Sequence, residues 1–318
     1  MEDNLGKFFG VEGYALPKCT TNESKVPMSK GLHPELDNSE LLNEAGHRCY
    51  QQLIGSAQWL CGIGRADIQF SVTSLNRFSA APRASQLAYC IRMFSFLKEF
   101  PEREIVIDHR DHEFFAQFGE PDPTMEELYP DSVEELDENM PEAFGPELQT
   151  SVWFDSDHGH DALTKRSCTG LVVMVGRTPV YWSAKRQTSI QTSSYSAEFM
   201  AGRSACEEAI SLRYMLRCLG VKIKGRTFLA GDNLGMLQSS TIVSSMCKKK
   251  HISIAYHKMR ECVAAGIINP VKVHTDYNVA DFLTKSLAWK ELHYHSGSFF
   301  SRWTTGTEVD WAVTSLDF

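Results

Sequence analysis

Four acidic residues in the second half of the sequence stand where their carboxylates could meet. Asp155 ends one short apolar run, and Asp232 ends another, RTFLAGD. Glu198 precedes Ala201 by one turn on the inward stripe of an expected helix, and Asp281 lies in the first turn of the last expected helix. An acid on a buried helix face is costly unless it is paired or binds a cation. The spacing therefore predicts a shared site.

The chemistry of such a site follows from its charge. Clustered carboxylates repel one another, and a hard divalent cation with oxygen ligands relieves that repulsion. Two such ions about 4 Å apart form an arrangement that hydrolyses phosphodiesters. We expect two Mg²⁺ or Mn²⁺ ions, with Asp155 and Asp232 as central ligands and Glu198 and Asp281 completing one ion each. Solvated termini and helix N-caps are the alternative for each acid taken singly.

Asp155 opens the dense stretch DSDHGHD, which could itself be taken for a metal cluster. A magnesium-type site has little use for imidazole. We therefore expect Asp155 to be the only ligand here. The other polar residues of the stretch are assigned to the turn and the rim of the site, namely Asp157, His158, His160 and Asp161.

The elements that must position these acids alternate between strands and helices in residues 151–290. The runs rich in β-branched and aromatic residues predict five strands, at SVWFDS, GLVVMVG, PVYWSA, RTFLAGD and NPVKVHT. Helical spacing predicts helices at 201–219, 234–243, 252–265 and 279–287. The predicted fold class is α/β, with a mixed five-stranded sheet flanked by helices.

The first half of the chain divides by pattern. Residues 1–46 carry many turn formers and predict irregular or extended structure, whereas helical spacing in 47–100 predicts a small helical domain. Residues 101–150 form an acidic linker or surface insertion; mimicry of a nucleic-acid backbone and partner docking remain alternatives. The tail, 291–318, stays unassigned. These ranges, with 151–290, are the expected domains.

The charge and the cysteines bound the class of protein. The formal net charge is −8, but residues 116–150 hold eleven acidic residues and no Lys or Arg, so the remainder is mildly basic. A nucleic-acid partner is therefore not excluded. No apolar run reaches the roughly 20 residues of a membrane span, and the first residues lack a signal-peptide pattern. Nine scattered cysteines without a C-x-x-C pair predict reduced thiols and an intracellular, cytoplasmic protein.

Several motifs in collinear order carry a family resemblance. WFDSDHGHDALTKRSCTG, SSYSAEFMA, AGDNLGM, KKKHISIAYHKMRE and VADFLTKSL resemble the RNase H domain of copia-type LTR retrotransposon Pol polyproteins. Upstream, CYQQLIGSAQWLCGIGRADIQF resembles the segment after the reverse-transcriptase palm, so the resemblance covers about residues 8–290. It implies an RNase H-like fold and hydrolysis of the RNA strand of RNA–DNA hybrids. It also implies that Asp155, Glu198, Asp232 and Asp281 are the metal ligands.

The departures from the family pattern leave rival functions open. Ser196, His158 and Ser286 replace the usual acid, aromatic residue and proline. No Y-x-D-D motif occurs, so we do not expect DNA synthesis by this chain alone; a palm domain from the same polyprotein or another chain is the implied partner. An active element would place the protein in a virus-like particle. A decayed or domesticated copy would instead be a nucleic-acid-binding or scaffold protein. An integrase core would show the order D, D, E, whereas this chain shows D, E, D, D.

Polar residues near the ligands are candidate contacts with nucleic acid. A basic ridge could contact phosphates, and an RNA–DNA hybrid would be recognised by its backbone shape and 2′-hydroxyls. The candidates are Ser193, Ser194, Asn233, Lys248, Lys249 and Lys250. A solvated turn is the alternative for the lysines. The resemblance also implies a mobile catalytic histidine, for which His274 is the candidate, although a structural role is the commoner one for a histidine at a strand end.

Overall fold

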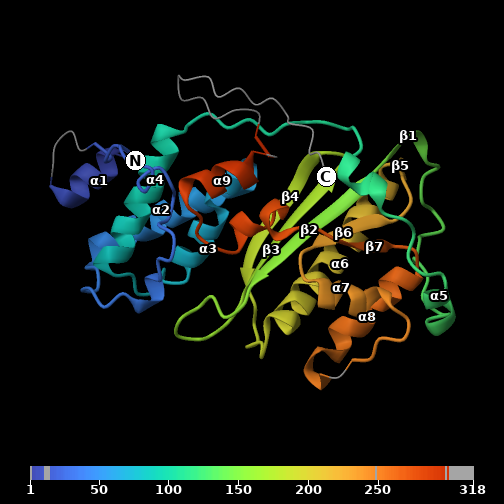
Figure 1. Cartoon of the computed structure of the whole chain (residues 1–318). Helices are drawn as coiled ribbons and strands as arrows, with labels where there is room; N and C mark the ends of the chain where they lie inside the picture. The colour runs from blue at the N-terminus through green and yellow to red at the C-terminus, as the bar shows by residue number, and fades with distance from the viewer. Residues whose placement is uncertain (1, 11–14, 248, 298, 301–318) are drawn as a thin grey trace.

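A mixed five-stranded sheet lies at the centre of the computed structural model, which describes residues 2–10, 15–247, 249–297 and 299–300 (Figure 1). In spatial order its strands are β4 (Thr178–Arg186), β3 (Cys168–Val175), β2 (Thr150–Asp157), β6 (Thr227–Gly231) and β7 (Ile268–Lys272). β2 pairs antiparallel with β3 and parallel with β6, and β7 continues the parallel half. The predicted α/β class, with a mixed five-stranded sheet flanked by helices, is confirmed.

The strands are apolar along their length because both faces of the sheet are covered. Side chains alternate between the faces of a strand. In β2, Val152 and Phe154 enter one hydrophobic core, while Trp153 between them enters the other. Val172 and Val173 divide in the same way on β3. This two-sided burial accounts for near-continuous runs such as LVVMV.

Three helices cover the face of the sheet that carries Phe154. They are α6 (Ser194–Cys218), α7 (Leu234–Thr241) and α8 (Ser253–Ala264). The stripe Ala201, Ala205 and Ala209 on α6 is fully buried, and these small side chains let the helix lie close to the strands. Within the described part of the chain, neither α6 nor any other helix combines the length and apolar character that a membrane span requires.

The predicted helical segment covers the opposite face. It consists of α2 (Glu44–Ile63), α3 (Gln69–Asn76) and α4 (Ala84–Glu99), joined there by α9 (Trp289–Ser296) from the other end of the chain (Figure 1). Leu53 and Phe94 of the helices share one hydrophobic core with Trp153 and Met174 of the sheet. The helical segment therefore packs directly on the sheet, and the domain boundaries drawn from the sequence stay a prediction.

The helix predicted over 279–287 is wrong. The chain there forms one turn of 3-10 helix, η6 (Asp281–Leu283), which follows another such turn, η5 (Thr275–Tyr277), and precedes α9. Asn278 donates a side-chain hydrogen bond to the Phe154 carbonyl at 2.9 Å and accepts one from the Ala280 amide at 3.2 Å. These bonds tie the segment to β2 and hold its backbone away from a regular helix.

The N-terminal segment also differs from its prediction. Glu2–Phe9 form a helix, α1, and a 3-10 turn, η1, spans Pro34–Leu36. Leu5 of α1 is fully buried in the core that contains α2. Eight residues give too weak a pattern to reveal a helix from the sequence, because packing rather than propensity stabilises so short an element.

The acidic segment packs on the rest of the chain at several points, and its assignment as a linker or surface insertion stays a prediction. Residues 108–148, here called the acidic strap, include η3 (Glu113–Gln117), α5 (Thr124–Leu128) and β1 (Phe144–Leu148), which pairs in parallel with β5 (Val221–Ile223). Phe115 stacks on Phe228 at 4.4 Å between ring centroids. Glu134 forms ion pairs with Arg213 and Arg217 of α6. The strap is thus held by apolar and ionic contacts.

Candidate active site

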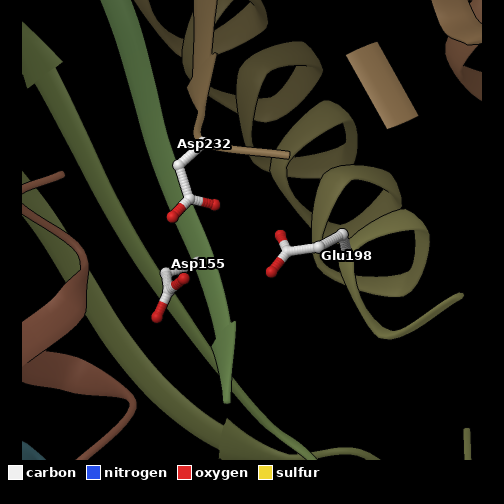
Figure 2. Close-up of side chains that lie close together, drawn as sticks. All are labelled: Asp155, Glu198 and Asp232. Atoms are coloured by element: carbon white, nitrogen blue, oxygen red, sulfur yellow. The ribbon is translucent and has the colours of Figure 1, made fainter. Parts of the chain in front are cut away.

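Two neighbouring parallel strands and one helix bring three of the predicted acids together. Trp153 of β2 is paired with Ala230 of β6. Two residues further along, Asp155 of β2 therefore lies beside Asp232, the residue that follows β6. Glu198 reaches the same point from near the start of α6, which packs on β2. Each residue offers a carboxylate oxygen, and these three atoms lie within 4.8 Å of one another. Figure 2 shows the three side chains pointing toward a common centre.

Two of the three carboxyl groups are buried close to other acidic residues. Asp155 is 5% exposed and Glu198 4%, whereas Asp232 is half-buried. Burial, and then the charge of Asp281, raise the pKa of Asp155 to about 7. Burial, followed by the charges of Asp155 and Asp232, raises the pKa of Glu198 well above its ordinary value. Both shifts reflect carboxyl groups that are buried and lie close to other acidic residues.

Three hydroxyl groups orient these carboxylates. Ser156 donates to Oε1 of Glu198 at 3.2 Å, and Thr275 donates to Oδ2 of Asp232 at 2.8 Å. Thr284 donates to Oδ2 of Asp155. A hydroxyl supplies one hydrogen-bond donor and no charge. These groups therefore orient the carboxyl groups without adding a positive charge.

Asp281, the fourth predicted acid, stands at the edge of the cluster. It lies in η6 and is 5% exposed, and its Oδ2 is 2.7 Å from Nζ of Lys285. Burial raises the pKa of Asp281, and the hydrogen bond from Lys285 opposes that rise. Burial lowers the pKa of Lys285, but the hydrogen bond to Asp281 and the charges of Asp281, Asp155 and Asp157 outweigh it, so the net shift is upward. The structure therefore brings together a triad and sets the fourth acid beside it, paired with a lysine.

The donor set fits a hard divalent cation. Glu198 Oε2 and Asp281 Oδ1 are buried atoms without a hydrogen-bond partner among the described residues, a costly state that a cation would relieve. All the converging ligand atoms are carboxylate oxygens, which suit Mg²⁺ and Mn²⁺ better than softer metals.

The remaining residues of DSDHGHD do not join the triad. His160 Nδ1 lies 2.8 Å from Asp157 Oδ2, and His158 Nε2 lies 3.0 Å from the Gln191 carbonyl. Asp161 lies in the turn after β2, but it is fully buried there and not exposed at a rim. It forms ion pairs with two arginines that lie far from it in the sequence, Arg77, the residue after α3, and Arg186 of β4.

The predicted nucleic-acid contacts surround the start of α6 and α7. Ser193 and Asn233 are N-caps whose side chains accept from the amides of Ser196 and Met236. Ser194 is exposed in the first turn of α6. Their acceptor atoms serve the helices, and contact with nucleic acid stays a prediction for all three.

Two of the three predicted lysines can be located. Lys249 donates to the Ser193 hydroxyl, and its ammonium lies 5.3 Å from the centroid of the Tyr195 ring, which places it at the start of α6. Lys250 is exposed at the beginning of a 3-10 turn, η4 (Lys250–Ile252). Lys248 lies outside the described residues.

His274 lies in a turn and not in a strand. β7 ends at Lys272, and His274 caps the 3-10 turn η5 with its side chain 68% exposed. The next residue, Thr275, donates to Asp232. His274 is therefore adjacent in sequence to a residue that contacts the triad, and its catalytic role stays a prediction.

Sequence reasoning missed Thr284 and Lys285 as members of the site. Both follow Asp281 in the motif ADFLTKS, at spacings of three and four residues. On a helical turn those spacings bring side chains to one face, so a search for basic and hydroxyl residues around each acid could have found them.

Comparison with known proteins gives relatives but no matching family model. The chain is 26% identical over 239 residues to the retrovirus-related Pol polyprotein from transposon RE1 of Arabidopsis thaliana, covering 75% of this chain and 14% of that protein. It is 29% identical over 131 residues to the corresponding polyprotein from transposon TNT 1-94 of Nicotiana tabacum, covering 41% and 10%. The chain thus spans about one seventh of the RE1 polyprotein.

Solved structures resemble part of the chain. RNase H1 from the archaeon Halobacterium salinarum NRC-1 matches at 17% identity with a TM-score of 0.34, covering 43% of this chain and 94% of that one. The foamy viral protease-reverse transcriptase, solved in complex with an RNA/DNA hybrid, matches at 14% identity with a TM-score of 0.32, covering 50% and 22%. The relatives named above, together with the motifs in their collinear order, make this chain a homologue of the Pol polyproteins of copia-type retrotransposons, with an RNase H-like sheet carrying a candidate acidic triad.

Proposed function

We propose that this chain is a ribonuclease H-type endonuclease that hydrolyses the RNA strand of RNA–DNA hybrids. The observation that carries the proposal is the convergence of Asp155, Glu198 and Asp232 within 4.8 Å, with Glu198 Oε2 buried and without a partner among the described residues. A structural role alone does not account for three carboxylates that lie together and form no ion pair with an arginine or lysine among the described residues, because their repulsion destabilises the fold. A site that receives cations and a phosphodiester does account for them.

In this proposal Asp155 and Asp232 are central ligands for two Mg²⁺ or Mn²⁺ ions, and Glu198 and Asp281 complete one ion each. When bound, the ions supply Lewis acidity that activates water and stabilises negative charge at the scissile phosphate. The chain itself contributes orientation: Thr284 and the hydroxyls of Ser156 and Thr275 fix the carboxylates before substrate arrives. A carboxyl group binds a cation in its deprotonated form, so the raised pKa values of Asp155 and Glu198 oppose cation binding at low pH.

The nucleic acid would approach along the starts of α6 and α7. Lys249, beside Ser193, supplies positive charge at this end of α6, and exposed Lys250 can neutralise a further phosphate. Such contacts bind backbone rather than bases, so we expect little sequence preference. Since the chain spans 14% of the RE1 polyprotein, a polymerase palm from the same polyprotein or from another chain is the proposed protein partner.

The test is cleavage of a hybrid whose RNA and DNA strands carry different labels. We expect the purified chain to cut the RNA strand in Mg²⁺ or Mn²⁺ and to leave the DNA strand, RNA duplex and single-stranded RNA intact. Removal of the metal with EDTA should stop cleavage. Binding of the hybrid without cleavage in either metal would favour the rival function, a nucleic-acid-binding remnant of a retrotransposon.

A further inference from the structure

Lys285 places a positive charge against the fourth acid of the site. Its Nζ lies 2.7 Å from Oδ2 of Asp281, and its side chain is 37% exposed whereas that of Asp281 is 7% exposed. Asp281 therefore meets its partner in a largely desolvated place, where an ion pair is stronger than at the surface. Lys285 is therefore the positively charged partner of Asp281 in this structure.

No other lysine or arginine forms an ion pair with Asp281 among the described residues, although the charge of His295 also acts on this carboxylate. Among the described residues, the four acids form a single ion pair, that between Asp281 and Lys285. Lys272 is also close, but it donates to the backbone carbonyls of Asp232 and Val273 rather than to a carboxylate. Lys285 thus differs from an ordinary surface lysine by contacting a site carboxylate directly.

The ion pair with Lys285 uses only one of the two carboxylate oxygens of Asp281. Its Oδ1 is buried without a hydrogen-bond partner among the described residues, and Asp281 is absent from the group whose oxygens converge within 4.8 Å. The next residue before Lys285, Thr284, donates to Asp155 of that group, so the two acids are linked through one short segment. A cation at Asp281 would therefore have to share or displace the contact that Lys285 makes.

We propose that Lys285 is a built-in counter-ion that competes with a divalent cation for Asp281. The inference rests on the proposed function. Without nucleic acid, the chain binds one divalent ion at Asp155, Glu198 and Asp232, while Lys285 keeps Asp281 neutralised. The negative charge of an incoming phosphodiester favours a second divalent ion at Asp281, and Lys285 then moves away from that carboxylate.

The test is Mn²⁺ binding to the full chain without nucleic acid, followed by calorimetry and by electron paramagnetic resonance. Wild type should bind one ion tightly. Lys285→Met should gain a second ion or tighten its binding by at least about tenfold, the scale on which groups next to a ligand affect metal affinity. Lys290→Met, an exposed lysine on α9, is the matched control and should behave as wild type.

A double variant separates competition from misfolding. Asp281→Asn in the Lys285→Met background should abolish the gain, and Lys285→Gln should reproduce it, with circular dichroism verifying the fold. Unchanged or weakened Mn²⁺ binding in folded Lys285→Met and Lys285→Gln would overturn the inference. The readout uses no hydrolysis, so absence of hybrid cleavage would count against the proposed function while leaving the binding comparison intact.

Discussion

Thr284 donates a hydrogen bond through Oγ1 to Oδ2 of Asp155, although 129 positions separate the two residues. The hydroxyl is buried and its oxygen also lies 3.0 Å from the Asp281 carbonyl oxygen, so its one proton is shared between two acceptors. One side chain therefore fixes a triad carboxylate to the turn that carries the fourth acid. The relationship makes the segment after β7 part of the site, and it gives the first prediction.

Thr284→Val keeps the shape of the side chain and removes the donor. We expect hybrid cleavage to fall at least about tenfold, since groups that orient a metal ligand have effects of that size, and the free energy of unfolding to fall by about 1–2 kcal/mol. Steady-state kinetics and urea denaturation measure the two effects. Thr284→Ser restores the hydroxyl and should recover most of the activity; equal loss in both variants would contradict the role of the hydrogen bond.

Gly170 lies opposite Asp155 in the β2–β3 pair and lets the η6 segment approach the sheet. A Cβ there would lie 2.7 Å from Cγ2 of Thr284 and 2.8 Å from the Ala280 carbonyl oxygen. Gly170→Ala should therefore destabilise the chain by about 1–3 kcal/mol and lower cleavage by moving Thr284. Gly55→Ala is the control, because that glycine is exposed on α2 and a Cβ would meet nothing within 4 Å. Denaturation and cleavage curves that do not distinguish the two variants would refute this packing argument.

The raised pKa of Asp155 predicts a pH dependence of stability in EDTA. Unfolded aspartate titrates near about 3.9, whereas burial and the charge of Asp281 raise the pKa of Asp155 to about 7 in the folded chain. Between these values the folded chain holds a proton that the unfolded chain releases. The stabilisation is therefore complete below about pH 4 and is lost as the pH rises through about 7.

The pH dependence of the free energy of unfolding, compared between wild type and Asp155→Asn, measures this effect. Half-buried His112 and His293, with pKa values lowered to about 4 by burial, act in the opposite direction because they destabilise the fold on acidification. Only the difference between the two proteins isolates Asp155. Between pH 4 and pH 8 we expect the free energy of unfolding of Asp155→Asn to rise by about 1–4 kcal/mol relative to that of wild type. Urea denaturation measures it. Parallel stability curves would show that Asp155 does not titrate in this range.

The ion pairs of Asp161 predict a stabilising link between the helical segment and the sheet. Arg77→Met leaves the fully buried Asp161 with Arg186 as its ion-pair partner among the described residues. We expect the free energy of unfolding to fall by about 1–3 kcal/mol. Arg48 pairs with Glu44 on the exposed side of α2, so Arg48→Met should stay within about 0.5 kcal/mol of wild type. Urea denaturation measures both. A similar small effect in both variants would mean that burial of Asp161 adds nothing to the pair.

The strands and the triad could be predicted because local patterns determine them. β2, β3 and β6 are short apolar runs, and acids at the carboxyl ends of parallel neighbours such as β2 and β6 meet at one edge of the sheet. Glu198 was predictable from its place on the alanine stripe of α6. In each case the pattern lies within a few residues of the feature it predicts.

The remaining features depend on contacts between distant segments. The turn at Asp281 replaces a helix because Asn278 bonds to β2, 124 residues earlier. Asp161 was assigned to the turn and rim of the site, and only the folded chain shows its contact with Arg77, 84 residues before it. The acidic strap is held by the stacking of Phe115 on Phe228 and by the ion pairs of Glu134, which no local pattern announces. Such pairings become visible only when the chain is folded.

Cleavage of a labelled RNA–DNA hybrid by Asp232→Asn tests the central claim most directly. Asparagine keeps the size of the side chain but removes the charge of a proposed central ligand, so we expect the rate in Mg²⁺ to fall at least about a hundredfold, more than loss of a group next to a ligand. Asp276→Asn, whose side chain is 79% exposed in the neighbouring turn, should cleave at close to the wild-type rate. Cleavage by Asp232→Asn at the wild-type rate would contradict the account.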